Sequence, residues 1–199
     1  MQVNGFQWPE RDVHCRQVVF NTTRDMEHAL NLCTEMNVCV QAGGNAGVWP
    51  AWLAEHFHTV YTFEPDPENF RCLVQNVPEN VITLQAALGN NHGTIALSGD
   101  PANCGAYFVE GEGPIPTLQI DDLHLPACDL IVLDIEGMES MALDGARDTI
   151  RRHRPVLLYE DKGLSRRYGV EKGEIEERMA GLGYKVAHRI HRDVILVHG

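Results

Sequence analysis

The sequence has no long apolar run and few basic residues. No apolar stretch approaches the roughly 20 residues that a helix needs to cross a bilayer, so we expect no membrane partner. Residues 1–17 contain no apolar segment typical of a secretory signal, which predicts a cytoplasmic protein. Lysine and arginine number 16 against 28 aspartates and glutamates, a net charge of -12. This balance argues against a nucleic-acid partner, because such proteins usually present a basic face.

Several short motifs are also missing. No C-x-x-C pair occurs, and four of the six cysteines lie in apolar runs, which predicts reduced core residues rather than a disulfide framework or a zinc site. The G-x-G-x-x-G spacing of NAD-binding folds is absent, and no lysine with serine or threonine follows the glycines, which excludes a P-loop. The cysteines are Cys15, Cys33, Cys39, Cys72, Cys104 and Cys128.

The chain does show a regular alternation of short apolar runs with helical periodicity. Runs that are apolar throughout indicate strands buried on both faces, hence a mostly parallel, doubly wound α/β sheet. Residues 89–113, rich in glycine and asparagine, predict hairpin and loop, and residues 186–190 and 194–198 alternate like a C-terminal antiparallel hairpin. The expected helices are 24–36 (with Thr23 as its cap), 50–56, 67–76, 140–152 and 175–182, and the expected strands are 38–42, 60–63, 81–85, 130–133 and 156–159.

A glycine-rich segment, QAGGNAG, ends the first expected strand and precedes a helix. Glycines there permit a sharp turn and bring backbone N–H groups close to a ligand. The second strand ends at Glu64, 21 residues after Gly43, which is about where an adenosine ribose meets a carboxylate in such folds. On its own, the glycine loop is equally typical of a purely structural turn. Glu64 on its own is equally typical of an acid at the protein surface. Together they favour an adenosine-containing ligand, because two carboxylate oxygens match two vicinal hydroxyls.

Acidic residues follow the next two expected strands. Asp134 and Glu136 come after residues 130–133, and Glu160 and Asp161 end the following strand. Neighbouring carboxylates can position a cation, hold a metal or act as a base when one pKa rises. The structural alternative is that one of them caps the following helix, or that Asp161 lies in a solvated turn. We take Asp134 as the first candidate catalytic base and Glu136 and Glu160 as the second; a divalent metal bridging them is an alternative that we do not favour.

With these residues identified, the chain resembles the FkbM-type methyltransferases. The matching pieces, which include VCVQAGGNAGVWP, VYTFEPDPENFRCLVQNV and CDLIVLDIEGMESMALDGARDTI, fall in the family's order and cover residues 38–161. The resemblance implies a Rossmann-like fold, S-adenosylmethionine as the donor and, usually, transfer to oxygen. In it the glycine loop cradles the methionine part of the donor, Glu64 holds the ribose and residues 86–88 border the adenine. We therefore expect donor contacts from Gln41, Gly43, Gly44, Asn45, Gly47, Glu64, Pro65, Ala86, Ala87, Leu88 and Asp134.

Two positions depart from that family's pattern. Gln41 stands where the family commonly has aspartate, so a contact with the donor's amino group would lack charge. The position before the D-I-E-G segment commonly carries lysine, whereas Val132 and Leu133 are apolar. The 199 residues suit one domain, with an N-terminal extension and helix (1–37), a cofactor-binding core (38–161) and a C-terminal helix and hairpin (162–199).

The leading hypothesis is methyl transfer from S-adenosylmethionine to an oxygen of a small-molecule or carbohydrate acceptor. A non-catalytic nucleotide-binding or adenosine-binding module is the alternative from another class, and it leaves the acidic residues unexplained. An NAD-dependent enzyme would suit Glu64 but lacks its glycine fingerprint. The acceptor pocket is expected to involve the middle loop and residues 162–172.

Overall fold

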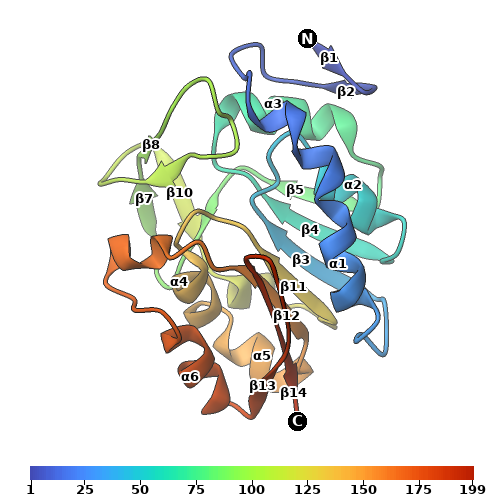
Figure 1. Cartoon of the computed structure of the whole chain (residues 1–199), viewed down its shortest axis with the longest axis vertical. Helices are drawn as coiled ribbons and strands as arrows, with labels where there is room; N and C mark the ends of the chain where they lie inside the picture. Colours follow the sequence, from blue (N-terminus) through green and yellow to red (C-terminus); the bar gives the residue numbers. More distant parts are fainter.

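The computed structural model describes the backbone of residues 1–199 and the side chains of all of them except Arg24 and Asp25. At its centre is a sheet of order β13–β14–β12–β11–β3–β4–β5 (Figure 1). From β12 to β5 all neighbours pair in parallel, whereas β14 pairs antiparallel with both β12 and β13. This confirms the expected doubly wound, Rossmann-like α/β fold with a C-terminal antiparallel hairpin. The strands are β3 Val38–Ala42, β4 Thr59–Phe63, β5 Val81–Leu84, β11 Leu130–Leu133, β12 Val156–Glu160, β13 Tyr184–Ile190 and β14 Asp193–His198.

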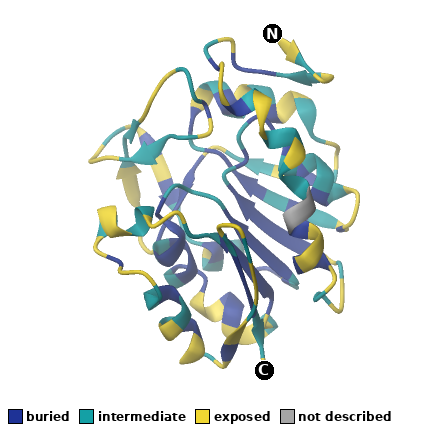
Figure 2. Cartoon of the chain, in the orientation of Figure 1, coloured by how far each residue is buried: buried dark blue, intermediate teal, exposed yellow. Residues whose placement is uncertain are grey.

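Helices cover both faces of this sheet, and the central strands β3, β11 and β12 are almost entirely buried (Figure 2). Because side chains alternate along a strand, Val38 and Val40 pack in the cluster that includes α4, α5 and α6, while Cys39 packs in the cluster that includes α1 and α2. Among the described residues, no helix is both long and apolar enough to cross a membrane. The helices are α1 Thr23–Leu30, α2 Val48–Ala54, α3 Pro67–Asn76, α4 Glu139–Asp144, α5 Arg147–His153 and α6 Glu174–Ala180, with 3-10 turns η1 Cys15–Gln17, η2 Val19–Asn21, η3 Ile120–Leu123 and η4 Leu164–Tyr168.

The first expected helix is shorter than its periodicity suggested. It ends at Leu30 rather than near residue 36, and its N-cap position is Thr22 rather than Thr23. The hydroxyl of Thr22 donates to the carbonyl of Val19 (2.7 Å) and accepts from the indole N–H of Trp49 (2.8 Å). The side chain of Thr22 therefore bonds to Val19 and Trp49 instead of capping the helix N-terminus.

The expected helix over 140–152 is split in two at Gly145. An added Cβ at Gly145 would lie 2.1 Å from the carbonyl oxygen of Gly89, so the middle loop approaches the helix axis at this point. The carbonyl of Gly145 leaves the helical pattern and accepts the N–H of Asp121 (3.0 Å). Helical periodicity continues through the break in the sequence, which is why the pattern alone predicted one helix.

Short strand pairs flank the main sheet. In residues 89–113, where hairpin and loop were expected, β8 pairs antiparallel with β9, and β7 joins a small sheet of order β6–β10–β7. The N-terminus forms a hairpin around Asn4 and Gly5, whose φ values of 48° and 86° suit the tightest hairpin turns. These strands are β1 Gln2–Val3, β2 Phe6–Gln7, β6 Ala87–Leu88, β7 Gly93–Ile95, β8 Leu97–Ser98, β9 Phe108–Val109 and β10 Ile115–Leu118.

A buried carboxylate, Asp12, joins the N-terminal segment to the middle loop. It accepts hydrogen bonds from the indole of Trp8 (2.8 Å) and from the backbone N–H groups of Cys15 (3.1 Å), Arg16 (2.9 Å) and Cys104 (3.1 Å). Burial alone would raise the pKa of Asp12, but these four donors outweigh it and hold the pKa below its ordinary value. The two segments are thereby fixed to one another beside the carboxyl ends of β3 and β4.

Replacement of Gly145 by alanine should destabilise the protein. The added methyl group cannot occupy a point 2.1 Å from the Gly89 carbonyl, so the backbone of the loop or of the helix break must shift. We expect a loss of about 1–3 kcal/mol in the free energy of unfolding, measured by urea titration. Gly93→Ala is the control, because a Cβ there finds only an ordinary contact of 3.7 Å with Thr117. Equal stability of the two variants would contradict this account of the break.

Candidate functional site

A cavity of about 810 Å³ opens beyond the carboxyl ends of the parallel strands, within the size range of small-molecule sites. Its walls come from the loop after β3, the ends of β4, β11 and β12, the N-terminal segment and the middle loop. Gln41 and Gly47 lie outside the lining. The sequence-predicted residues that line the cavity are Gly43, Gly44, Asn45, Glu64, Pro65, Ala86, Ala87, Leu88, Asp134, Glu136 and Glu160.

The glycine loop is held tightly against two strand ends. The N–H groups of Gly43 and Gly44 both donate to the carbonyl of Phe63, at 3.1 and 2.9 Å. Gly43 has φ 85°, and a Cβ there would lie 2.0 Å from the carbonyl oxygen of Asp134. Glycine at this position is therefore what lets the ends of β3 and β11 approach, and it brings the loop beside the predicted base.

Gly47 has a different role from the one the sequence suggested. Its φ of 97° makes the turn that begins α2, and a Cβ would contact Leu73 and Val77, each at 3.2 Å. Its open side thus faces α3 rather than the cavity. The expected contact between Gly47 and a ligand is replaced by a contact between loop and helix, because the turn into α2 directs this residue inward.

The side chain of Gln41 also forms its hydrogen bonds within the protein. Its amide nitrogen donates to the carbonyls of Ala42 (3.1 Å) and Gly43 (3.0 Å), and its amide oxygen accepts the hydroxyl of Thr62. The side chain is fully buried behind the cavity wall. We expected it to contact the donor's amino group; in its position it instead supports the carbonyl groups at the start of the glycine loop.

Glu64 presents a desolvated carboxylate to the cavity. One oxygen accepts the N–H of Asn45 (2.7 Å) and the other the N–H of Asp66 (2.8 Å), while the residue is only 5% exposed. Burial raises its pKa to about 7, although these hydrogen bonds oppose the shift. A carboxylate has about four lone-pair sites, so acceptor capacity remains for hydroxyl groups of a ligand. This chemistry fits the vicinal hydroxyls of a ribose.

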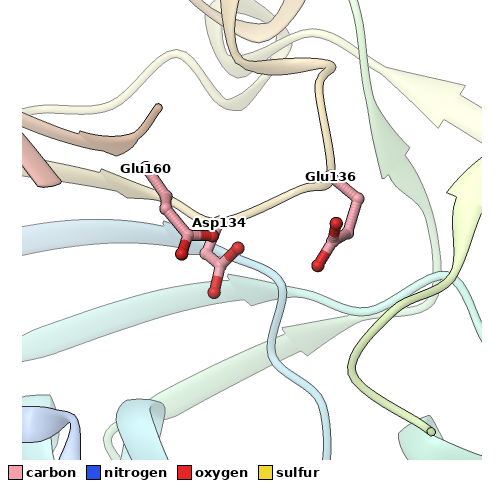
Figure 3. Close-up of side chains that lie close together, drawn as sticks. All are labelled: Asp134, Glu136 and Glu160. Atoms are coloured by element: carbon pink, nitrogen blue, oxygen red, sulfur yellow. The ribbon is translucent and has the colours of Figure 1, made fainter. Parts of the chain in front are cut away.

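Three carboxylates meet at the other side of the cavity. Each of Asp134, Glu136 and Glu160 offers one oxygen, and these oxygens all lie within 4.8 Å of one another. Figure 3 shows Asp134 and Glu160 side by side at the ends of adjacent strands, with Glu136 reaching toward them from the loop. The sequence expectation that Asp134 and Glu136 project to one place therefore agrees with the observed geometry. We call these three residues the acidic rim.

Lys162 supplies the positive charge for the acidic rim. Its ammonium lies 3.0 Å from Glu136 and 3.5 Å from Asp134, and it forms an ion pair with Glu160 as well. Burial opposes its charge, but the three carboxylates raise its pKa, so it stays protonated. From the sequence, Lys162 was expected only as part of the acceptor-pocket region 162–172, and its pairing with the acidic residues was not predicted. The signal was the lysine two residues after Glu160, at the same sheet edge.

The acidic rim also holds a proton. Burial, followed by the hydrogen bond to Asp134 and by that residue's charge, raises the pKa of Glu160 to about 9. Glu160 is therefore the member of the acidic rim that most readily holds a proton, and it can share that proton with Asp134 through their hydrogen bond. Glu136, whose pKa is raised chiefly by burial, faces Lys162. Of the three candidates, Asp134 is thus the one that lies beside both Glu160 and the glycine loop.

Glu139 holds the loop that carries the acidic rim. Its carboxylate accepts the N–H groups of Ile135 (3.1 Å) and Gly137 (3.2 Å), around a turn in which Glu136 has φ 54° and Gly137 φ 111°. The residue is 2% exposed, and burial raises its pKa to about 7. The sequence left open whether Asp134 or Glu136 capped the next helix. Instead, the N–H groups of this loop donate to Glu139, so the side chains of Asp134 and Glu136 can face the cavity.

The remaining walls come from the middle loop, which the sequence predicted to take part in the acceptor pocket, and from the N-terminal segment, which had no predicted role. The N-terminal segment, residues 8–22, has no periodicity that places it over a sheet edge, and a buried tryptophan is as typical of a core as of a pocket. Its position depends on the long-range contacts of Asp12, which no local pattern reveals. The cavity residues from these segments include Trp8, His14, Cys15, Val18, Thr22, Asn103, Cys104, Ala106 and Tyr107.

A family model described as the methyltransferase FkbM domain matches residues 41–186 of the chain. That span contains the glycine loop, Glu64, the acidic rim and Lys162. No curated protein gives a match to the sequence.

Solved structures share the fold at low sequence identity. A methyltransferase FkbM from Methylobacillus flagellatus matches with a TM-score of 0.54 and 20% identity, covering 80% of this chain and 42% of that one. This chain therefore spans less than half of that protein. An rRNA methylase from Streptococcus thermophilus gives 0.53 and 14%, covering 88% and 94%. Magnesium protoporphyrin IX methyltransferase from Synechocystis, solved with bound S-adenosylmethionine, gives 0.52 and 14%, covering 92% and 79%.

The buried acid Glu139 should make stability fall as pH rises. Its pKa is about 7 in the folded protein against an ordinary 4.5, so between these values the folded state holds a proton that the unfolded state has released. Its stabilising contribution is complete below pH 4.5 and is lost as pH approaches 7. In Glu139→Gln this loss is absent. Between pH 5 and pH 8 the free energy of unfolding of the variant should therefore rise by roughly 2–3 kcal/mol relative to that of wild type.

The measurement is urea unfolding of both proteins across that pH range. Glu35→Gln, which changes an exposed acid, serves as the control and should follow wild type. Parallel pH profiles for Glu139→Gln and wild type would show that Glu139 is not desolvated as described.

Proposed function

The chain belongs to the FkbM methyltransferase family, and on that premise we propose that it transfers the methyl group of S-adenosylmethionine to a hydroxyl oxygen of a small-molecule or carbohydrate acceptor. One observation carries the proposal. The glycine loop, which would hold the donor, lies against the backbone of Asp134, the acid best placed to accept a proton. A non-catalytic binding module would have no use for that juxtaposition.

Residues of this chain fit the donor. Glu64 would accept hydrogen bonds from the ribose hydroxyls, the backbone of the glycine loop would pack against the methionine part, and the apolar residues 86–88 would border the adenine. When bound, the donor supplies an electrophilic methyl group on a positively charged sulfur. The protein's task is then to hold the acceptor oxygen in line with that methyl, an effect worth roughly 7–11 kcal/mol of the barrier.

Asp134 is proposed to remove the acceptor's proton. It lines the cavity and its side chain is 30% exposed, so an acceptor hydroxyl can reach it. The carboxyl of Glu160 donates to it and fixes its orientation. Lys162 offsets the charge of the acidic rim, so that Asp134 and Glu136 can both remain near the acceptor without driving one another to protonation.

The same lysine argues against a metal-dependent reaction. The oxygens of the acidic rim are close enough to hold a cation, but the ammonium of Lys162 is already paired with all three carboxylates. A divalent ion would have to displace this internal cation and leave a buried ammonium without partners, which is costly. We therefore favour base catalysis by the acidic rim alone.

Substitution of Glu64 by glutamine should weaken donor binding and change its pH dependence. In wild type, affinity for S-adenosylhomocysteine should rise as pH increases through 7, because the ionised carboxylate accepts ribose hydroxyls more strongly than the protonated one. Asp66, whose N–H binds Glu64, forms an ion pair with Arg11 at 2.5 Å. Glu64→Gln should bind about tenfold more weakly at pH 8 and lose the rise, as measured by calorimetry from pH 6 to 8.

The matched control is Glu68→Gln, which changes a nearby acid that pairs with Arg11 and does not line the cavity. It should keep the pH dependence of wild type. Unchanged affinity in folded Glu64→Gln would remove Glu64 from the donor site.

Substitution of Asp134 by asparagine should abolish transfer while leaving the fold intact. The change keeps the shape of the side chain and removes the basic oxygen, so turnover should fall by roughly 10²–10⁴-fold. The assay follows radiolabelled methyl transfer to a panel of hydroxyl-bearing small molecules and oligosaccharides, with the thermal midpoint measured in parallel. Asp161→Asn is the control, because Asp161 serves a local turn through the N–H of Gly163 (3.1 Å).

A large fall in thermal midpoint with normal specific activity of the folded fraction would make Asp134 a structural residue. Inhibition of wild-type transfer by EDTA, reversed by a divalent cation, would overturn the metal-free mechanism.

A further inference from the structure

Two cysteines from distant parts of the chain meet at the cavity wall. Cys15 lies in η1 and Cys104 in the middle loop, and both line the cavity. The amide of Asn45, in the glycine loop, donates to the sulfur of Cys15 (3.1 Å) and accepts the thiol of Cys104 (3.3 Å). Each thiol also shifts the pKa of the other. They therefore form a coupled pair beside the loop that would hold the donor.

The backbone geometry suits a disulfide between them. A single oxygen of Asp12 accepts the N–H groups of both Cys15 and Cys104, each at 3.1 Å, so the two backbones are immediate neighbours. Because one Asn45 amide also contacts both sulfurs, little movement separates this arrangement from the short Cα and Cβ separations of a disulfide. Gly105 leaves the necessary room, because a Cβ there would lie 2.9 Å from the Cys15 sulfur.

We propose that Cys15 and Cys104 are a site of reversible oxidation, at which a peroxide converts the two thiols into a disulfide that weakens donor binding. The site itself follows from the contacts of the two cysteines. Its effect on the donor rests on the function proposed above.

The environment assigns the two sulfurs different roles. Interaction with Cys104, together with the hydrogen bond from Asn45, lowers the pKa of Cys15 against the effect of burial, whereas interaction with Cys15 and burial raise the pKa of Cys104. Cys15 is thus the thiol that ionises more readily, and its thiolate is the form that attacks peroxide. One oxygen bonds to its sulfur as a sulfenic acid, the O–O bond breaks and the other oxygen leaves as water. The sulfur of Cys104 then displaces the sulfenic hydroxyl, which takes the Cys104 proton and leaves as a second water.

In total the two thiols lose two electrons and two protons, and the peroxide is reduced to two waters. The sequence analysis predicted reduced core cysteines, and the reduced state is the one described here. Cys33, Cys39 and Cys128 have the environment of core residues, because burial raises the pKa of each and none lines the cavity. Access to the cavity is what distinguishes Cys15 and Cys104 from them.

The disulfide would act on the donor site through Asn45. Oxidation removes the thiol hydrogen that binds the Asn45 amide oxygen, and it draws together the two sulfurs that hold this side chain. Asn45 has φ 46°, a conformation that asparagine adopts when its side chain is locally held, and its N–H binds Glu64. Loss of that support should disturb the carboxylate that would receive the ribose. We expect at least a threefold loss of affinity for S-adenosylhomocysteine.

The test treats the folded protein with hydrogen peroxide, blocks remaining thiols with an alkylating reagent and maps the peptides by mass spectrometry. We expect a cross-linked pair containing Cys15 and Cys104, lighter by two hydrogens and reversed by dithiothreitol. Cys15→Ser and Cys104→Ser should not form it. Cys72→Ser, which changes a half-buried cysteine outside the cavity lining, is the control and should form it.

Affinity is compared before and after peroxide within each protein. The oxidised wild type and Cys72→Ser should bind S-adenosylhomocysteine more weakly and recover on reduction, whereas Cys15→Ser and Cys104→Ser should show no such change. Failure to cross-link in the folded protein, or oxidation of Cys15 only to sulfinic acid, overturns the proposed site. A cross-link that leaves affinity unchanged overturns the coupling to the donor. If the reduced protein binds no donor at all, the proposed function fails while the cross-link remains a separate result.

Discussion

The close approach of β3 and β11 at their carboxyl ends is the constraint on which the site depends. Ala42 and Leu133 are register partners, so the chain leaves both strands side by side, and the glycine loop begins where the acidic loop begins. No side chain larger than hydrogen fits at Gly43, because the Asp134 carbonyl occupies the space. The hydrogen bond from the Asp134 N–H to the Ala42 carbonyl (3.2 Å) extends the parallel ladder by one step and fixes this contact. A donor loop and a proton acceptor are thereby joined through backbone alone, independently of any ligand.

Electrostatics then determine what the acids at this junction can do. Three carboxylates in one half-buried place would repel one another and take up protons. The structure distributes the charge unequally: the raised pKa of Glu160 favours its protonated form, and Lys162 contributes a positive charge beside Asp134. Glu139 keeps the connecting loop in place while contributing no charge to the cavity at low pH. The arrangement resembles a general base with its own proton donor and counter-ion, which is more specific than a cluster of acids that caps a helix.

Much of this could be predicted from the sequence because the relevant signals are local. The apolar runs predicted the parallel strands. The residues just after each run predicted that Glu64, Asp134 and Glu160 lie at one sheet edge, and the structure places them there. The failures have a common cause. The split at Gly145, the internal hydrogen bonds of Gln41 and the reach of Lys162 into the acidic rim all depend on contacts between segments far apart in sequence. Periodicity and spacing carry no information on such contacts. The pattern therefore predicted one continuous helix across Gly145 and a ligand contact from the buried amide of Gln41.

The N-terminal segment shows the same limit most clearly. Residues 8–22 carry no motif, yet they form a wall of the cavity, because one buried carboxylate, Asp12, binds N–H groups from both this segment and the middle loop. A carboxylate with four hydrogen-bond donors strongly favours its ionised form, so the junction is insensitive to pH over the range in which Glu64 and Glu139 titrate. The cavity therefore combines a rigid frame, set by Asp12 and the strand ends, with acids that respond to protonation. A change in ligand binding that follows the titration of Glu64 would then arise at an acid that faces the ligand rather than at the Asp12 junction.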